Sequence, residues 1–303
     1  MKFVLPKYPL RKRISISFSG GKTSAYMTVM LLEHFRQHPE YEVVVVFANT
    51  GQEHEETLTF VDRCDREFGF DLVWIESVTH HGSRKGVGFR KTSYDFACRK
   101  GEPFQDYIQK YGIPNQNYNQ CTSRLKTEPM DAFRKSIGWE KETYSTAIGI
   151  RADEIDRVSA TALANGIFYP CADAGITKAD VRDWWAKQSF NLNIPEHLGN
   201  CTWCWKKSKR KLMTLTQSHP EIFEFPRKME KLYGMAGGQR RDKAEKKEPR
   251  VFFRGKMTVD DLFAEATQPF TPFDDEHFIP FDDDLDVGGG CGESCEIGAD
   301  LPD

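Results

Sequence analysis

The feature that most constrains this fold is a short apolar run followed at once by a glycine-rich hexad and then by a helical pattern. Residues 14–18 read Ile-Ser-Ile-Ser-Phe, residues 19–24 read Ser-Gly-Gly-Lys-Thr-Ser, and an apolar run through Met30 and Leu31 follows. We therefore predict a strand, a tight loop and the start of a helix. Glycines let the backbone approach an anion closely, and the N–H groups and positive dipole end of a helix attract one. This order predicts a loop that binds phosphate.

The side chains of the hexad fit the same role. Its members are Ser19, Gly20, Gly21, Lys22, Thr23 and Ser24. The three hydroxyl groups can donate hydrogen bonds to a phosphate, and the lysine can add positive charge. The hexad is not a Walker loop, which has four residues between its first glycine and its Gly-Lys pair. A tight turn between strand and helix, with a capping serine, stays open as the alternative interpretation.

Short β-rich runs alternate with helical stretches through the first half of the chain, which is typical of a parallel sheet covered on both faces. The expected strands are residues 14–18, 42–47, 71–75, 143–148 and 167–169. An unbroken valine run from Val43 to Val46 suits a central strand that is buried on both faces. We predict an α/β fold, with a doubly wound, mostly parallel sheet of about five strands and helices on both faces.

Composition and turn residues suggest how the rest is organised. We expect residues 1–215 to form the main domain, residues 216–280 a helical and charged extension, and residues 281–303 a flexible, acidic tail rich in Gly and Cys. The glycine-containing and basic segment 76–102 is too long for an ordinary connection, so we expect a functional or mobile loop. Thr177, with Asp180 three residues later, predicts a capping box at the start of a helix.

Bulk properties describe an ordinary globular protein and name no partner. The net charge is -3, with 39% hydrophobic and 29% charged residues. No apolar run approaches the roughly 20 residues that span a bilayer, and the basic N-terminus leads into a strand rather than a signal core. We expect a cytoplasmic protein with no membrane partner. Eight cysteines in such a chain indicate thiol or metal chemistry rather than a disulfide framework.

Three segments together carry a resemblance to a known family. The hexad resembles the PP-loop of the adenine-nucleotide α-hydrolase superfamily. Residues 47–53, Phe-Ala-Asn-Thr-Gly-Gln-Glu, resemble the second segment of its phosphoadenylyl-sulfate (PAPS) reductase-like branch, and residues 149–154, Gly-Ile-Arg-Ala-Asp-Glu, resemble the arginine motif of that branch. The likeness runs from residue 14 to residue 212. The ATP pyrophosphatases of the superfamily usually have Asp where Thr23 stands.

The second segment follows the expected central strand, and ligands of open α/β sheets bind at the carboxyl ends of parallel strands. We therefore predict that Asn49, Thr50, Glu53 and Glu56 meet ribose, base or metal, and that Gly51 forms part of the same nucleotide-binding corner. The alternative is that the acidic residues here only favour the dipole at a helix start.

Arg151 and Arg157 follow the expected strand at residues 143–148, and guanidinium groups there suit phosphate or sulfate recognition. An ion pair within one helix, such as Asp153 with Arg157, is the competing interpretation. Together with Lys22 and Ser24, we expect these arginines to act in catalysis by stabilising phosphate charge that develops in the transition state.

A cysteine pair forms the second constellation. Cys201 and Cys204 make a C-x-x-C motif, which needs outside partners to complete a tetrahedral metal site. Cys121 is the expected third ligand, because its segment also resembles the reductase-like branch, and His197 or Cys98 is expected as the fourth. Zinc accepts three or four thiolates, whereas an iron–sulfur cluster normally takes four. A redox dithiol, or two buried cysteines without a ligand, stay open as alternatives.

The tail contains a further candidate. Reductases of the resembled family carry a nucleophilic cysteine in a C-terminal Glu-Cys-Gly-x-His segment, and Cys291-Gly292 matches only its Cys-Gly core. Because Glu293 and Glu296 lie close by in the sequence, the thiol needs to dock near the arginines to become reactive.

The resemblance implies an enzyme that acts at the α-phosphate of ATP or a related adenine nucleotide, with Mg²⁺, in sulfur metabolism or sulfur transfer to a larger acceptor. A true PAPS or adenylyl-sulfate reductase using Cys291, and a non-catalytic nucleotide-sensing or nucleic-acid-binding module, are the alternatives. The acceptor is expected to be a nucleic acid or a protein, and a homodimer stays open. Lysines after Cys204, with Trp203 and Trp205, suit nucleic acid, although a solvated helix face explains them equally well.

Overall fold

The structure is a computed structural model that describes residues 10–82, 86–237 and 248–274. Its centre is a six-stranded sheet with strand order β4-β3-β2-β1-β5-β6. The strands are β1 (Arg13–Ser17), β2 (Glu42–Asn49), β3 (Leu72–Thr79), β4 (Val87–Thr92), β5 (Tyr144–Ala147) and β6 (Ile167–Phe168). All neighbours pair in parallel except β3 with β4. The predicted α/β fold with a mostly parallel sheet is confirmed.

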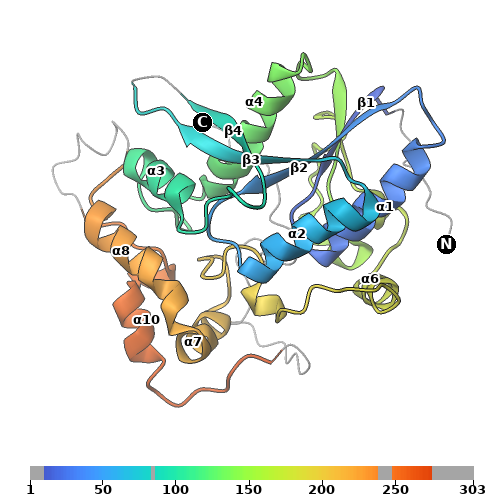
Figure 1. The fold of residues 1–303 in the computed structure, drawn as a ribbon. Coiled ribbons are helices and arrows are strands. Elements are labelled where there is room, and N and C mark those ends of the chain that lie inside the picture. Colours follow the sequence, from blue (N-terminus) through green and yellow to red (C-terminus); the bar gives the residue numbers. More distant parts are fainter. Residues whose placement is uncertain (1–9, 83–85, 238–247, 275–303) are drawn as a thin grey trace.

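Helices cover both faces of this sheet (Figure 1). The α-helices are α1 (Lys22–Phe35), α2 (Glu55–Phe68), α3 (Glu102–Tyr111), α4 (Glu128–Ser136), α5 (Pro170–Asp173), α6 (Lys178–Trp185), α7 (Lys209–Ser218), α8 (Glu224–Tyr233) and α10 (Val259–Glu265). The π-helix is η1 (Ser123–Thr127), and the 3₁₀-helices are η2 (Ala152–Arg157), η3 (Glu196–Leu198), η4 (Pro220–Phe223) and η5 (Arg254–Lys256). Helix α2 ends at Gly69, whose φ of 64° is the left-handed conformation that glycine adopts without strain.

The central strand β2 shows why the valine run was informative. Val45 and Phe47 lie in the core that β1 and β2 share with α1 and α2, whereas Val46 and Ala48 lie in the core beneath α4. Successive side chains of a strand point to opposite faces, so both faces of β2 must be apolar. Figure 1 shows α1 and α2 on one side of the sheet and α4 on the other.

The segment expected to be one long loop instead contains an edge strand. Strand β4 pairs antiparallel with β3, from Trp74 opposite Thr92 to Thr79 opposite Val87. The strand was missed because its sequence, Val-Gly-Phe-Arg-Lys-Thr, has glycine and charges and is only partly buried, so it lacks an apolar alternation. The prediction of a loop over residues 76–102 was therefore wrong for this part.

A second apolar core joins the C-terminal helices to α3. Phe104 and Ile108 of α3 pack in one cluster with Leu212 of α7, Met229 of α8 and Leu262 of α10. In Figure 1, α7, α8 and α10 lie at the lower left, below α3. The domain limits at residues 215 and 280 stay a prediction. The tail, with Cys291 and Cys295, lies outside the described residues.

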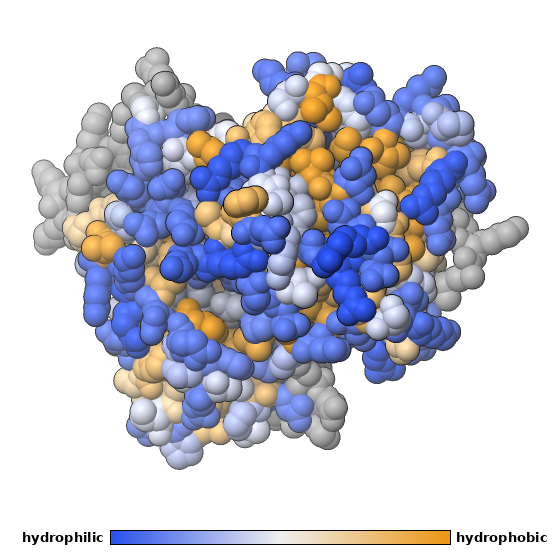
Figure 2. Space-filling model, viewed as in Figure 1, coloured by the Kyte–Doolittle hydropathy of each residue, from blue (hydrophilic) through white to orange (hydrophobic). Residues whose placement is uncertain are grey.

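The face of the molecule drawn in Figure 2 is largely polar. Figure 2 shows hydrophilic residues over much of the visible face, with smaller hydrophobic areas between them. Within the described ranges, no helix combines the length and the apolar character that crossing a membrane requires.

Candidate functional site

The glycine hexad forms the predicted turn between β1 and α1. Gly20 has a φ of +86°, and a Cβ atom there would lie 3.0 Å from Cγ2 of both Thr57 and Val61. Only glycine meets both demands without strain. Gly21 is the N-cap of α1 in an extended conformation, and no side-chain hydrogen bond caps this helix start. The positive end of α1 is therefore directed at the space in front of the loop.

Two of the predicted hydroxyl donors hold the loop itself. The Ser24 hydroxyl donates to the carbonyl oxygen of Gly21 at 3.0 Å and accepts from the backbone N–H of Ser19 at 3.2 Å. The Thr23 hydroxyl accepts from Nη1 of Arg151 at 3.0 Å. Both residues are fully buried. In this structure their contacts fix the shape of the loop rather than facing a ligand.

A pocket with a volume of about 430 Å³ opens in front of the loop. Its lining includes Ser19, Gly20, Gly21 and Lys22 of the loop, Thr57 of α2, Lys178, Val181 and Arg182 of α6, and residues of the segment 192–200. The lysines and the arginine make the wall electropositive, while Leu192 and Ile194 add an apolar side. The size falls within the range of pockets that hold small ligands. A phosphate at the loop would meet both the helix dipole and these cations.

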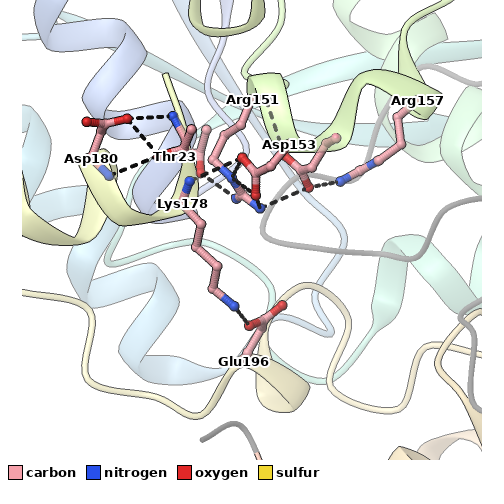
Figure 3. Close-up of polar contacts among 9 residues, drawn as sticks. Thr23, Arg151, Asp153, Arg157, Lys178, Asp180 and Glu196 are labelled. Atoms are coloured by element: carbon pink, nitrogen blue, oxygen red, sulfur yellow. Dashed lines mark hydrogen bonds and ion pairs between the residues drawn. The ribbon is translucent and has the colours of Figure 1, made fainter. Parts of the chain in front are cut away.

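Arg151 of the arginine motif lies beside Thr23 of the loop, as Figure 3 shows. Arg151 donates from Nε to a carboxylate oxygen of Asp153 at 3.1 Å, and Arg157 pairs with Glu154. Although burial opposes ionisation, the hydrogen bonds and charge of Arg151 lower the pKa of Asp153 overall. Arg151 also pairs with Glu154, at 3.5 Å, so local ion pairs of the kind named in the competing interpretation are present beside these arginines. Arg151 therefore lies among carboxylates next to the glycine loop, and Arg157 pairs with one of the same carboxylates.

The second predicted segment forms a tight corner at the end of β2. Glu53 accepts from the backbone N–H and the hydroxyl of Thr50, at 3.0 and 2.8 Å, and lies 4.0 Å from Nζ of Lys126. The Oδ1 of Asn49 accepts from the Gly51 N–H at 3.1 Å. Asn49 and Thr50 are buried, and their polar groups hold the corner together. Contact of these residues with ribose, base or metal stays a prediction.

A buried carboxylate fixes the same corner from β3. Glu76 is completely buried and accepts from Nδ2 of Asn49 at 2.7 Å, the backbone N–H of Cys98 at 2.6 Å and Nη2 of Arg90 at 2.7 Å. Burial, followed by the charge of Glu76, raises the pKa of Cys98 to about 12. Cys98 therefore belongs to this network, and it does not line the cavity of the other predicted ligands.

Three predicted metal ligands do come together. Cys121, Cys201 and Cys204 line one small cavity of about 20 Å³ beside Thr50. Predicted ligand His197 lies elsewhere, with its ring 5.6 Å from the Phe273 ring. In the part of the chain that is described, no three or more His, Cys, Asp or Glu side chains are arranged to hold a metal ion. A fourth ligand and a bound metal stay predictions, and no chemical step is derived through one.

The loop that carries the cysteine pair is held by a buried lysine. Nζ of Lys207 donates to the carbonyl oxygens of Gly199, Cys201 and Thr202, at 3.0, 2.7 and 3.0 Å. Lys207 is 1% exposed, as is Trp203. Trp205 is buried too, so neither tryptophan is open to stack on a base. This part of the expected nucleic-acid surface was wrong, because both rings pack in the C-terminal core.

Sequence reasoning missed part of the pocket wall. Lys178, Arg182 and Glu196 line the pocket, although they lie far from the hexad in the sequence. The capping box of Thr177 and Asp180 is confirmed, and it marked the start of α6 correctly. No sequence pattern near the hexad or within α6 indicated that this helix lies beside the glycine loop.

A profile of the phosphoadenosine phosphosulfate reductase domain matches residues 13–165, which include the loop, the second segment and the arginine motif. The chain belongs to this family. An uncharacterised protein from the nin region of Escherichia phage lambda is 31% identical over 288 residues, covering 93% of this chain and 94% of that protein.

More distant similarities add less. An uncharacterised protein of Methanocaldococcus jannaschii is 28% identical over 145 residues, which cover 48% of this chain but only 24% of that protein. The phosphate complex of PAPS reductase from Candida auris aligns with 62% of this chain and 76% of that chain, at 15% identity and a TM-score of 0.35. No conclusion rests on that alignment.

Proposed function

We propose that this member of the PAPS reductase domain family is an adenine-nucleotide-dependent enzyme that acts at the α-phosphate of ATP, in sulfur metabolism or sulfur transfer to a larger acceptor. The observation that carries the proposal is the pocket in front of the hexad. There, the uncapped start of α1 and the Lys22 side chain line a space of about 430 Å³. Such a site binds and polarises phosphate groups.

The chain's own residues suggest how charge is stabilised. Lys22 lines the pocket, so its ammonium group can contact phosphate oxygens directly. Arg151 bonds to Thr23, the neighbour of Lys22, and so supports the loop, while Asp153 and Glu154 balance the guanidinium charge. Ser24 keeps the loop in shape through Gly21. Groups that are already in place cost no rearrangement when charge develops. Mg²⁺ would add further charge to the bound phosphates.

Product analysis tests this proposal. Purified protein with Mg²⁺ and ATP labelled in the α-phosphate is expected to release AMP and pyrophosphate, and the Lys22→Gln variant is expected to lose this activity. Release of ADP and inorganic phosphate would instead place the reaction at the γ-phosphate and contradict the proposal.

The family match supports a second candidate, reduction of PAPS or adenylyl sulfate. In that reaction the Cys291 thiolate attacks the sulfur, the nucleotide leaves, and a dithiol reductant then releases sulfite. Sulfite formed from PAPS in the presence of dithiothreitol would favour this candidate. Nucleotide binding without any product would favour a non-catalytic sensing module.

A further inference from the structure

An ion pair spans one side of the loop pocket. Lys178, the first residue of α6, pairs through Nζ with a carboxylate oxygen of Glu196 in η3. Both residues line the pocket. Their side chains are 54% and 30% exposed. In Figure 3 the Lys178 side chain extends from the arginine cluster to Glu196.

Hydrogen bonds fix the base of Lys178 relative to the phosphate loop. Its backbone N–H donates to Oδ1 of Asp153 at 3.1 Å. Asp153 in turn accepts from Arg151, which donates to Thr23 in the loop. The capping box of Thr177 closes the helix start on the same side. The loop, the arginine motif and the start of α6 therefore form one connected unit, with the Lys178 side chain leaving it toward the pocket.

Positively charged side chains outnumber negatively charged ones in the pocket. Its lining holds the cations Lys22, Lys178 and Arg182, and Glu196 is the only carboxylate among the described lining residues. An exposed ion pair contributes little stability, so a multiply charged anion can replace one partner. A phosphate chain that starts at the loop and runs along α6 would offer such an anion.

We propose that Lys178 binds the phosphate chain of the nucleotide, and that Glu196 holds the same ammonium group while the pocket is empty. The nucleotide must then displace Glu196 from Lys178. The binding free energy gained by Lys178 increases with the charge of the phosphate chain. A nucleoside triphosphate therefore displaces Glu196 more readily than a monophosphate does, and the site favours the triphosphate. This inference rests on the proposed nucleotide function and adds a residue that sets phosphate specificity.

Binding of ATP and AMP to four proteins tests the inference by calorimetry: wild type, Lys178→Gln, Glu196→Gln and the double variant. Lys178→Gln is expected to weaken ATP binding about tenfold and AMP binding less, since a hydrogen bond to a charged group has roughly that value. Glu196→Gln is expected to tighten ATP binding several-fold, because it removes the competitor. In the Lys178→Gln background, Glu196→Gln should change nothing, since the two effects act through one contact.

Lys187→Gln is the matched control, because Lys187 is exposed and does not line the pocket. It is expected to bind ATP like the wild type. Weaker ATP binding by Glu196→Gln would contradict the proposed competition between Glu196 and phosphate, and would show that Glu196 supports ATP binding. Unchanged ATP affinity of a folded Lys178→Gln variant would overturn the role of Lys178 while leaving the nucleotide function intact. Wild-type protein that binds neither nucleotide would instead refute the proposed function itself.

Discussion

At the scale of single residues, several side chains of the motifs serve the protein rather than face a ligand. Asn49 donates to buried Glu76, and Thr23 accepts from Arg151. These contacts set the shape of the glycine loop and of the corner after β2. Removing the charge of Glu76 would leave the Arg90 guanidinium without its buried partner. Most polar side chains of these motifs therefore support the backbone of the loop and corner, and few are left to face a ligand.

Gly20 allows a prediction at this scale. Gly20→Ala is expected to lower the free energy of unfolding by about 1–2 kcal/mol for the left-handed backbone, with a further loss from crowding against Thr57 and Val61. Gly138→Ala is the control, because Gly138 has a similar φ of +77° but open space around it. Urea unfolding of both variants measures the difference. Equal decreases in the free energy of unfolding for the two variants would mean that the loop relaxes around the methyl group added at Gly20.

At the scale of elements, the C-terminal helices are tied together by one carboxyl group. Glu230 of α8 accepts from the backbone N–H of Phe252 at 3.1 Å and of Val259, the first residue of α10, at 2.9 Å. Burial nevertheless raises the pKa of Glu230 to about 7. The same helices also pack against α3, which follows β4 in the chain. Protonation of one side chain is thus linked to the packing of this layer.

This linkage gives a pH prediction. A carboxyl group whose pKa is raised in the folded chain holds its proton more tightly there, so its contribution to stability is present at low pH. That contribution is lost as the pH rises from about 4.5 through about 7, a change of about 3 kcal/mol. Glu230→Gln stays neutral, so its unfolding free energy should fall less over this range.

Urea unfolding at several pH values between 5 and 8 measures the effect. The Glu224→Gln variant is the control, since Glu224 is an exposed residue of the same helix. It should keep the wild-type pH dependence. Parallel profiles for wild type and Glu230→Gln would show that Glu230 does not titrate in this range in the folded protein.

At the scale of the whole molecule, the pocket and the cysteine cavity share a chain segment. Glu196 and Asn200 line the pocket, and Cys201 and Cys204 line the cavity. The segment is also joined to the corner after β2, because the Thr202 N–H donates to the Gln52 carbonyl oxygen at 3.1 Å. The two constellations predicted separately from the sequence are therefore neighbours in the fold.

The tail provides the test at this scale that separates the two candidate reactions. Truncation after Gly288 removes Cys291 and Cys295. If the protein acts at the α-phosphate of ATP, the loop and arginines suffice, and the truncated chain should release pyrophosphate at close to the wild-type rate. The full chain with Cys291→Ser and Cys295→Ser is the control for the thiols alone. Loss of all nucleotide-dependent activity, with ATP affinity retained, would favour the reductase.

The sequence by itself determined the features that depend on neighbours along the chain. The strand before the hexad, the doubly buried β2, the end of α2 at Gly69 and the capping box at Thr177 all leave a local pattern of apolar, glycine or capping residues. Such patterns follow from the periods of strands and helices and from the backbone freedom of glycine. The place of the glycine loop at the start of α1 was predictable for the same reason.

Only the tertiary structure decided which distant side chains meet. The partners Arg151 and Thr23 are 128 residues apart, and Lys178 and Glu196 are 18 apart. Cys121 lines the same cavity as Cys201, which is 80 residues away in the sequence, and β4 was recognisable only through its pairing with β3. No local pattern in the sequence reveals these contacts, because they depend on how the sheet brings the ends of different strands and helices together.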